Sequence, residues 1–237
     1  MNKNNFIFNL IASDTPRSRA YVDQMIKNAL LPKKVIFIKK NSIAEKLKFK
    51  ANPYFDNETN LLNKLLSLKK IKIENIKVNS SNDIKCLRSV INSKQKFFIF
   101  SSNPGEILRK EYFDHDKTYL HVHPGKLPKF KGSTPYYYEI LNEKKITFTS
   151  LLMSHKLDEG KVLLSKSFNA NKLKHFDKST LDDVLDPYFR SLLLIETLKK
   201  YQYKKKNFTK FPKKNNRKYL SYFVIHPVLK NIAIFRK

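Results

Sequence analysis

The sequence predicts an α/β protein with a doubly wound, mostly parallel sheet and a helical C-terminal extension. The first observation is a set of short, nearly continuous apolar runs, such as Lys34–Ile38 and Phe97–Phe100, which are typical of strands covered on both faces. The second is that segments with apolar residues at helical spacing, such as Asp56–Leu68, alternate with these runs. This alternation favours parallel strands joined by helices.

Each expected element has a local signal. Expected strands, which are short and apolar, cover Asn5–Ala12, Lys34–Ile38, Ile73–Val78, Phe97–Phe100, Thr118–Val122, Ile146–Met153 and Lys161–Phe168. Expected helices cover Pro16 to Pro32, Asp56–Leu68, Ser81–Ile91, Glu106–Phe113, Pro135–Leu141 and Thr180 to about Tyr201. Pro16 opens the first helix and Pro32 closes it, whereas Ser80 or Ser81 is expected to cap the third.

The length of 237 residues allows one sizeable core with a small appendage. We expect a first domain over residues 1–170, which holds the candidate site described below. Residues 171–237 would form a C-terminal helix and a basic, apolar tail that packs on the core. The part of this tail from Tyr219 to Phe235 also offers a contact for a homodimer.

The formal net charge is +28, from 48 Lys and Arg against 20 Asp and Glu. Most of these basic residues are Lys scattered through every segment, whereas base recognition and phosphate clamping favour Arg. We therefore expect no nucleic-acid partner. The exception is Lys199–Lys218, where Lys alternates with Tyr and Phe. It is either a strip for a phosphate-bearing partner or a solvated linker.

Several features favour the cytoplasm. No apolar run approaches the length of a membrane span, and the N-terminus shows no signal peptide. The lone Cys86 excludes an internal disulfide, which fits a reducing compartment. We expect Cys86 to be a small buried residue rather than a catalytic thiol. With only four glycines, the chain has neither a P-loop nor a dinucleotide fingerprint.

The most informative feature is the segment His121-Val122-His123-Pro124-Gly125-Lys126-Leu127-Pro128, followed by Gly132 and then by Leu157-Asp158-Glu159-Gly160. Residues two apart on a strand point to the same side, so both imidazoles can converge on one ligand. The carboxylate of Asp158 is expected at the end of a second strand. The scarce glycines fall beside these residues, which suggests special backbone angles at a site.

These residues resemble the folate-dependent formyltransferase family, which includes glycinamide ribonucleotide, methionyl-tRNA and sugar N-formyltransferases. The family pattern is Asn-x-His-Pro-Ser-Leu-Leu-Pro-x-x-x-Gly, followed at a distance by Leu-Asp-x-Gly. The resemblance covers about residues 5–170, with specific matches in about 100–165. It implies a formyltransferase-like variant of the Rossmann fold, and an enzyme that transfers a formyl group from 10-formyltetrahydrofolate to an amine.

The resemblance implies catalytic roles for His121, His123 and Asp158. His123 would donate a hydrogen bond to the oxygen that becomes negative when the amine attacks. Asp158 would orient His123 or raise its pKa, and would help to remove the amine proton. His121 stands where the family has Asn; it can still donate one hydrogen bond, but it is bulkier and titratable. Gly125 stands where the family has Ser.

The resemblance also implies a folate pocket. The stretch Phe98–Leu108 resembles the strand and loop that line this pocket in relatives, so the cofactor-binding residues expected there are Asn103, Gly105, Ile107 and Leu108. His155 and Leu157 precede Asp158 and are expected to contact the cofactor as well. The loop also allows a cis peptide bond before Pro128. The cleft should lie at the carboxyl ends of the strands.

Two other interpretations stay open. His121, His123 and Asp158 also match a two-His, one-carboxylate metal site, as in an oxygenase or a metallohydrolase, although the loop from Pro124 to Gly132 fits the formyltransferase pattern without any metal. Alternatively, the protein is a catalytically inactive, formyltransferase-like binding protein, in which the histidines are structural and Asp158 forms a turn.

The expected substrate is a small-molecule primary amine, and an amino sugar on a nucleotide carrier is the best candidate. The stretch after about residue 170 is too short for the C-terminal barrel of methionyl-tRNA formyltransferases, and purine synthesis would be expected to keep the Asn. Tyr136-Tyr137-Tyr138 could face a nucleotide or sugar ring, or could equally lie half-buried on a helix.

Overall fold

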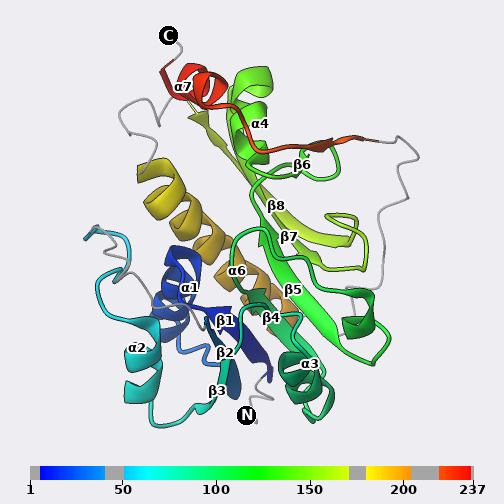
Figure 1. Ribbon diagram of the computed structural model, residues 1–237. Helices are drawn as coiled ribbons and strands as arrows, with labels where there is room; N and C mark the ends of the chain where they lie inside the picture. The colour runs from blue at the N-terminus through cyan, green and yellow to red at the C-terminus, as the bar shows by residue number, and fades with distance from the viewer. Residues whose placement is uncertain (1–5, 41–50, 171–179, 204–218, 236–237) are drawn as a thin grey trace. The chain divides into compact units, whose positions relative to one another are not determined.

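The computed structural model describes residues 6–40, 51–170, 180–203 and 219–235 (Figure 1). The chain divides into two compact units, unit 1 (Met1–His121) and unit 2 (Val122–Lys237). The expectation that residues 1–170 form one catalytic domain concerns function and stays a prediction.

Unit 1 is a parallel sheet with helices on both faces. Its elements are β1 (Asn9–Ser13), α1 (Pro16–Lys27), β2 (Lys34–Lys39), α2 (Leu61–Ser67), β3 (Lys72–Lys77), α3 (Ile84–Ile91), β4 (Phe97–Ser101), the 3-10 turn η1 (Lys110–Tyr112) and β5 (Thr118–His123), whose last two residues belong to unit 2. The strand order is β3-β2-β1-β4-β5 and each of these pairings is parallel. Helices α1 and α2 cover one face and α3 the other (Figure 1), as right-handed crossovers require. The predicted doubly wound fold is confirmed.

Apolar strands form the core of unit 1. Every residue of β1 and of β4 is buried, which explains why the sequence is rich in apolar residues at both strands. Leu10, Ile36 and Phe98 are fully buried. Each such side chain contributes about 1.5–3 kcal/mol by leaving water.

The start of α3 differs from expectation. Asp83 caps this helix by accepting a hydrogen bond from the backbone N–H of Lys85, so the prediction of Ser80 or Ser81 as the cap is wrong. Ser81 instead donates from its hydroxyl and its backbone N–H to the carboxylate of Glu106. A long-range partner therefore determines the role of Ser81, and local sequence does not reveal it.

Several predicted helices are shorter in the structure. Helix α1 ends at Lys27, where Asn28 forms the C-cap, so the prediction that Pro32 closes this helix is wrong. Helix α2 begins only at Leu61, because the Asp56 side chain accepts from the N–H groups of Glu58 and Thr59 and forms a turn there. The predicted helix Glu106–Phe113 reduces to the three residues of η1. The Glu106 carboxylate binds its own loop instead, as described below.

Unit 2 contains the remaining elements. They are β6 (Lys131–Gly132), α4 (Pro135–Glu143), β7 (Lys145–Leu152), β8 (Lys161–Asn169), the π-helix η3 (Leu181–Leu185), α6 (Asp186–Tyr203), β9 (Ser221–Tyr222) and α7 (Pro227–Phe235). Strands β7 and β8 pair antiparallel, and α6 packs on both. Helices α4 and α7 lie side by side (Figure 1). The helical C-terminal part is confirmed, but the short parallel pair β6–β9 was not predicted, because two-residue strands carry no periodic pattern.

The tail packs only in part on the rest of unit 2. Ala233 and Ile234 of α7 are buried, whereas Leu220 is 89% exposed and Phe223 87% exposed. A homodimer through this tail stays a prediction. Residues 204–218, and with them most of the Lys-rich strip, lie outside the described residues.

Within the segments that the structure describes, no helix combines the length and the apolar character that crossing a membrane requires. The cytoplasmic location stays a prediction.

Candidate active site

His123 and Asp158 face each other in unit 2. Nδ1 of His123 lies 3.3 Å from Oδ1 of Asp158, and the two side chains are only 3% and 10% exposed. Solvent and salt therefore screen this contact little. The pair is close enough to share a hydrogen bond, as its expected chemistry demands.

Asp158 is fixed by the backbone around it. Its Oδ2 accepts a hydrogen bond of 2.9 Å from the N–H of Gly132. Its φ of 53° lies in the left-handed region, which Asp tolerates better than most residues. Two residues on, a Cβ at Gly160 would lie 1.9 Å from the carbonyl oxygen of Leu152, so only glycine closes this loop against the end of β7.

The second ring nitrogen of His123 also has a protein partner. Nε2 lies 2.8 Å from the carbonyl oxygen of Phe130. Because a carbonyl only accepts, Nε2 carries a hydrogen in this contact. Nδ1 then either donates to an ionised Asp158 as part of an imidazolium or accepts from a protonated Asp158. The expected role of His123 as a donor to substrate oxygen stays a prediction, and it requires Nε2 to leave the Phe130 carbonyl.

The loop after β5 is tied to β7. The hydroxyl of Thr149 donates to the carbonyl of Gly125 over 2.7 Å and accepts from the N–H of Leu127 over 3.4 Å. The Leu127–Pro128 peptide bond is cis, as the sequence allowed.

Gly125 sits where no side chain fits. A Cβ at this position would lie 2.6 Å from the Phe130 carbonyl oxygen and 3.0 Å from Nε2 of His123. The structure thus gives a reason for glycine where the resembled family has Ser. The Phe130 carbonyl reaches His123 through the space that a side chain at 125 would fill.

His121 lies on the same strand two residues before His123, and strand alternation points both side chains to one side. Nδ1 of His121 lies 3.3 Å from the carbonyl oxygen of Phe100, within unit 1. Nδ1 therefore carries a hydrogen in this contact, and the neutral ring has an unprotonated Nε2. Nε2 can donate to a further group only when the ring is charged.

A partly buried carboxylate organises the loop that follows β4. Glu106 accepts from the hydroxyls of Ser81 (2.6 Å) and Ser102 (2.7 Å) and from the amide of Asn103 (3.1 Å). Burial alone would raise the pKa of Glu106, but these hydrogen bonds outweigh it and lower the pKa. Asn103, predicted as a cofactor ligand, thus helps to hold the loop itself. Sequence reasoning assigned Glu106 to a helix and missed this role.

The rest of this loop presents a mixed surface. Gly105 has a φ of +77°, and a Cβ there would meet nothing within 4 Å. Ile107 is 49% exposed, whereas Leu108 is 2% exposed and packs inside unit 1. Of the residues predicted to line a pocket here, Ile107 and Gly105 are therefore open to a ligand and the Leu108 side chain is not.

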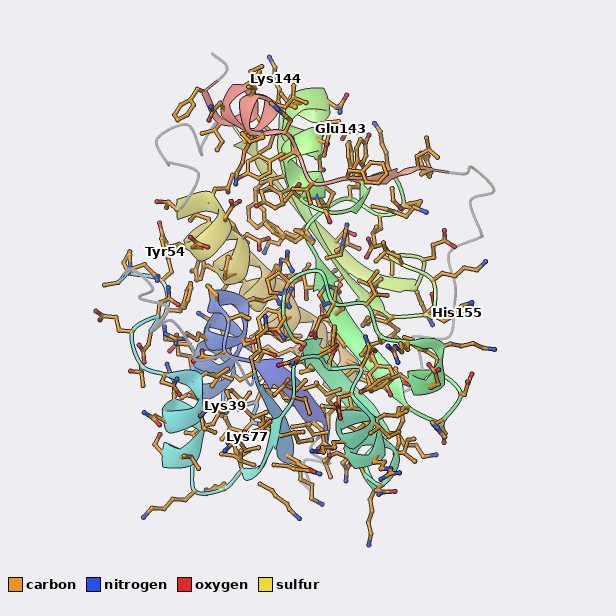
Figure 2. The ribbon with its side chains drawn as sticks, viewed as in Figure 1. Lys39, Tyr54, Lys77, Glu143, Lys144 and His155 are labelled. Atoms are coloured by element: carbon orange, nitrogen blue, oxygen red, sulfur yellow. The ribbon has the colours of Figure 1, made fainter. Side chains whose placement is uncertain are left out.

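The loop between β7 and β8 carries the other two predicted cofactor residues. Leu157 is 42% exposed and His155 is exposed on the outer part of this loop (Figure 2). Contact of either residue with a cofactor stays a prediction.

The three consecutive tyrosines are structural. Tyr136 and Tyr137 are buried, and both donate to Oδ1 of Asp182. The ring of Tyr138 stacks on that of Tyr222, with centroids 4.4 Å apart. These contacts support the interpretation of helix packing rather than a platform for a nucleotide.

Cys86 is buried, as predicted. Burial and the nearby carboxylates raise the pKa of its thiol to about 12. The side chain is therefore a thiol at neutral pH and is inert as a nucleophile.

Among the residues in the described ranges, no three His, Cys, Asp or Glu side chains are grouped so that they could hold a metal ion. The geometry thus gives the His-x-His metal interpretation no support.

Comparisons with known proteins point in one direction. No protein-family model matches the chain. The methionyl-tRNA formyltransferase of Borreliella burgdorferi (strain ZS7) is 31% identical over 114 residues, which cover 47% of this chain and 35% of the relative. That of Thermodesulfovibrio yellowstonii is 32% identical over 126 residues, 52% of this chain and 39% of the relative. The chain spans little more than a third of the length of these curated relatives.

Solved structures agree in fold. An N-formyltransferase from Helicobacter canadensis, in complex with folinic acid and dTDP-3-aminofucose, superposes with a TM-score of 0.62 at 20% identity, over 97% of this chain and 81% of that one. A phosphoribosylglycinamide formyltransferase from Anaplasma phagocytophilum gives 0.58 at 13% identity, over 92% and 100%. The chain is formyltransferase-like. At these identities the structures show a shared fold, whereas the curated relatives add the likeness in sequence.

In this formyltransferase-like chain, the sequence motif and the geometry coincide at His123 and Asp158. The replacement of the family Asn by His121 stays a prediction of the resemblance. Sequence reasoning missed the Phe130 carbonyl and the Gly132 N–H, because main-chain groups leave no residue-type signal.

Proposed function

We propose that the chain transfers a formyl group from 10-formyltetrahydrofolate to the primary amine of a small molecule. The observation that carries this proposal is the shielded His123–Asp158 pair, 3.3 Å apart, within the motif that resembles the formyltransferases. We further propose an amino sugar on a nucleotide carrier as the acceptor. The Helicobacter canadensis neighbour, solved with folinic acid and dTDP-3-aminofucose, supports both choices.

Each unit offers residues that suit contact with a folate. In unit 1 Ile107 exposes an apolar side chain, which suits contact with an aromatic ring system, and in unit 2 Leu157 does the same. Gly105 leaves its backbone open to close approach. Asn103 and His155 would add polar contacts, whereas Leu108 would support the loop from inside. When bound, the donor would supply a formyl group attached to one of its nitrogens. The oxygen of that formyl group would become negative as the amine attacks.

Asp158 is the proposed proton acceptor. As the amine nitrogen bonds to the formyl carbon it must lose a proton, and the carboxylate of Asp158 takes it directly or through one water. The N–H of Gly132 holds Oδ2, and His123 faces Oδ1, so the carboxylate keeps one orientation. When the bond between the formyl carbon and the folate nitrogen breaks, His123 and Asp158 return a proton to that nitrogen. Both residues are then in the protonation state in which they started.

The hydrogen-bond donor for the formyl oxygen comes from a histidine. Nε2 of His121 donates when that ring is charged, because Nδ1 already contacts the Phe100 carbonyl. Nε2 of His123 donates only after it leaves the Phe130 carbonyl. A donor aimed at developing charge in a water-poor site commonly contributes about 2.7–4 kcal/mol to catalysis.

The first test is calorimetric titration of the protein with 5-formyltetrahydrofolate, a stable mimic of the donor, repeated with His123→Ala and His121→Asn. Micromolar binding to the unsubstituted protein is expected. Absence of binding to all three proteins would contradict the folate proposal.

The second test offers 10-formyltetrahydrofolate with nucleotide-linked amino sugars and detects the product by the mass of one added formyl group. Asp158→Asn should slow transfer by roughly 10²–10⁴-fold, the usual contribution of general acid–base catalysis, while donor binding is kept. Glu159→Gln, the adjacent carboxylate, is the matched control and should keep the rate. Folate binding without transfer to any amine would favour the inactive binding protein instead.

A further inference from the structure

The C-terminal tail supplies a strand to the active-site loop. Strand β9 pairs in parallel with β6, so that Ser221 lies beside Lys131 and Tyr222 beside Gly132. The carbonyl of Tyr222 accepts a 2.9 Å hydrogen bond from the N–H of Ser133. A Cβ at Gly132 would lie 2.2 Å from this carbonyl oxygen, so only glycine at 132 lets the two backbones approach this closely.

The ring of Tyr222 makes a second attachment to the same loop. It stacks on Phe130 with centroids 5.8 Å apart and planes inclined by 17°, and on Tyr138 with 4.4 Å and 25°. Tyr222 thus lies between an aromatic residue of the loop and one of helix α4. Offset stacked rings of this kind contribute about 0.5–1.5 kcal/mol each beyond their burial.

Both attachments lead to the catalytic pair. The carbonyl of Phe130 contacts Nε2 of His123 over 2.8 Å, and the N–H of Gly132 donates to Asp158 over 2.9 Å. Tyr222 stacks on Phe130 through its ring, and its backbone lies beside Gly132 and accepts from the N–H of Ser133. One residue of the tail therefore braces the partners of both members of the pair without touching either of them.

Most residues next to Tyr222 are exposed to solvent and pack little against the rest of unit 2. Leu220 is 89% exposed, Phe223 87% and Val224 72%, whereas Ile225 is buried. The N–H of Ile225 donates to the Thr134 hydroxyl over 3.1 Å, beyond the loop that carries Phe130 and Gly132. Loss of the Tyr222 ring should therefore loosen the active-site loop more than it disturbs the core of unit 2.

We propose that Tyr222 is a positioning residue for the reaction at His123 and Asp158. It holds the Phe130 carbonyl in place, and this carbonyl keeps a hydrogen on Nε2 of His123. It also holds the Gly132 N–H in place, and this N–H orients Asp158. The consequence for the rate depends on the proposed formyl transfer, whereas the consequence for the His123 ring does not.

The test uses the full chain labelled with ¹⁵N-histidine. The hydrogen on Nε2 of His123, bound to a buried carbonyl, should give a slowly exchanging NMR signal, which His123→Gln removes and thereby assigns. Tyr222→Ala should speed its exchange by at least about tenfold or abolish the signal. Tyr222→Phe, which keeps the ring, should restore it, and Phe223→Ala, an exposed neighbour, should leave it unchanged.

Formyl transfer provides the second readout. Tyr222→Ala should lower kcat by about 10–100-fold with little change in the KM of the donor, because a misplacement of about 1 Å can cost 10²-fold. If Tyr222→Ala does not fold, Tyr222→Leu fills the space without stacking and takes its place. An unchanged His123 signal in a folded variant would overturn the proposal, as would an equal loss in Phe223→Ala. If the unsubstituted protein transfers no formyl group, the proposed function fails, and the NMR result still decides the role of Tyr222.

Discussion

Replacement of Gly125 by alanine should destabilise the protein far more than the same change at Gly105. The added Cβ at 125 would lie 2.6 Å from the Phe130 carbonyl oxygen and 3.0 Å from both Nε2 of His123 and Cγ of Pro135. Overpacking of this kind costs about 1–3 kcal/mol. Displacing the Phe130 carbonyl also breaks a buried hydrogen bond to His123, which costs about 1–3 kcal/mol more. The expected loss is therefore about 2–6 kcal/mol.

Gly105→Ala is the matched control. Its Cβ would meet nothing within 4 Å, but the backbone has a φ of +77°. The expected cost is that of a left-handed residue alone, about 1–2 kcal/mol. Both substitutions reduce the freedom of the unfolded chain alike, so that effect cancels in the comparison.

Urea unfolding at one pH measures both variants, and equal slopes show that the midpoints report stability. A Gly125→Ala variant as stable as Gly105→Ala would refute the reasoning. It would mean that the Phe130 carbonyl moves away from His123 at no cost, and that the loop has a second conformation of similar energy.

Three further predictions concern titration and reactivity. Because Nε2 of His121 is a proposed donor to the formyl oxygen, His121→Ala should lower the rate of transfer by roughly 10²–10³-fold, and His121→Asn, which supplies an amide N–H, should restore part of it. Equal rates in His121→Ala and the unsubstituted protein would exclude His121 as the donor. The lowered pKa of Glu106 stabilises the fold above the unfolded pKa of about 4.3, and this contribution is lost as pH falls through the folded pKa. Glu106→Gln should therefore be less stable at pH 7 yet lose less stability on acidification, as seen in urea midpoints; equal acid sensitivity would count against the hydrogen bonds at Glu106. Because burial raises the pKa of Cys86 to about 12 from an ordinary 9.0, its thiolate fraction at pH 8 is smaller by roughly a thousandfold. A thiol reagent should react with Cys86 only in denaturant, and rapid reaction of the native protein would show the assignment to be wrong.

The parts of the fold that the sequence predicts are those with strong local patterns. Strands β2 and β4 are continuous apolar runs and were placed within one residue of their observed ends. The prediction of a helix at Glu106–Phe113 was wrong because Ser81, which is distant in sequence, and the nearby Ser102 bind the Glu106 carboxylate. The β6–β9 pair failed for a similar reason, since its partners are about ninety residues apart and each is too short to show a period.

The candidate site also has a part that the sequence predicts and a part that it does not. Residue types within a recognisable spacing predicted that His123 and Asp158 would meet, and the structure brings them together. The groups that orient them are a carbonyl at Phe130 and an N–H at Gly132, which every residue type possesses. Only the glycines gave an indirect signal: a glycine-poor chain places Gly125 and Gly132 where a Cβ would strike backbone.

The backbone at Asp158 limits how this site can change over evolutionary time. At a φ of 53°, Asp, Asn and Gly are the residue types that fit most readily, whereas Glu tolerates the left-handed region less well. Neither Asn nor Gly can take up the proton of an amine. In a lineage that lost the chemistry, Asn or Gly is therefore the expected replacement at position 158. A census of close homologues at this one position would separate active branches from silent ones.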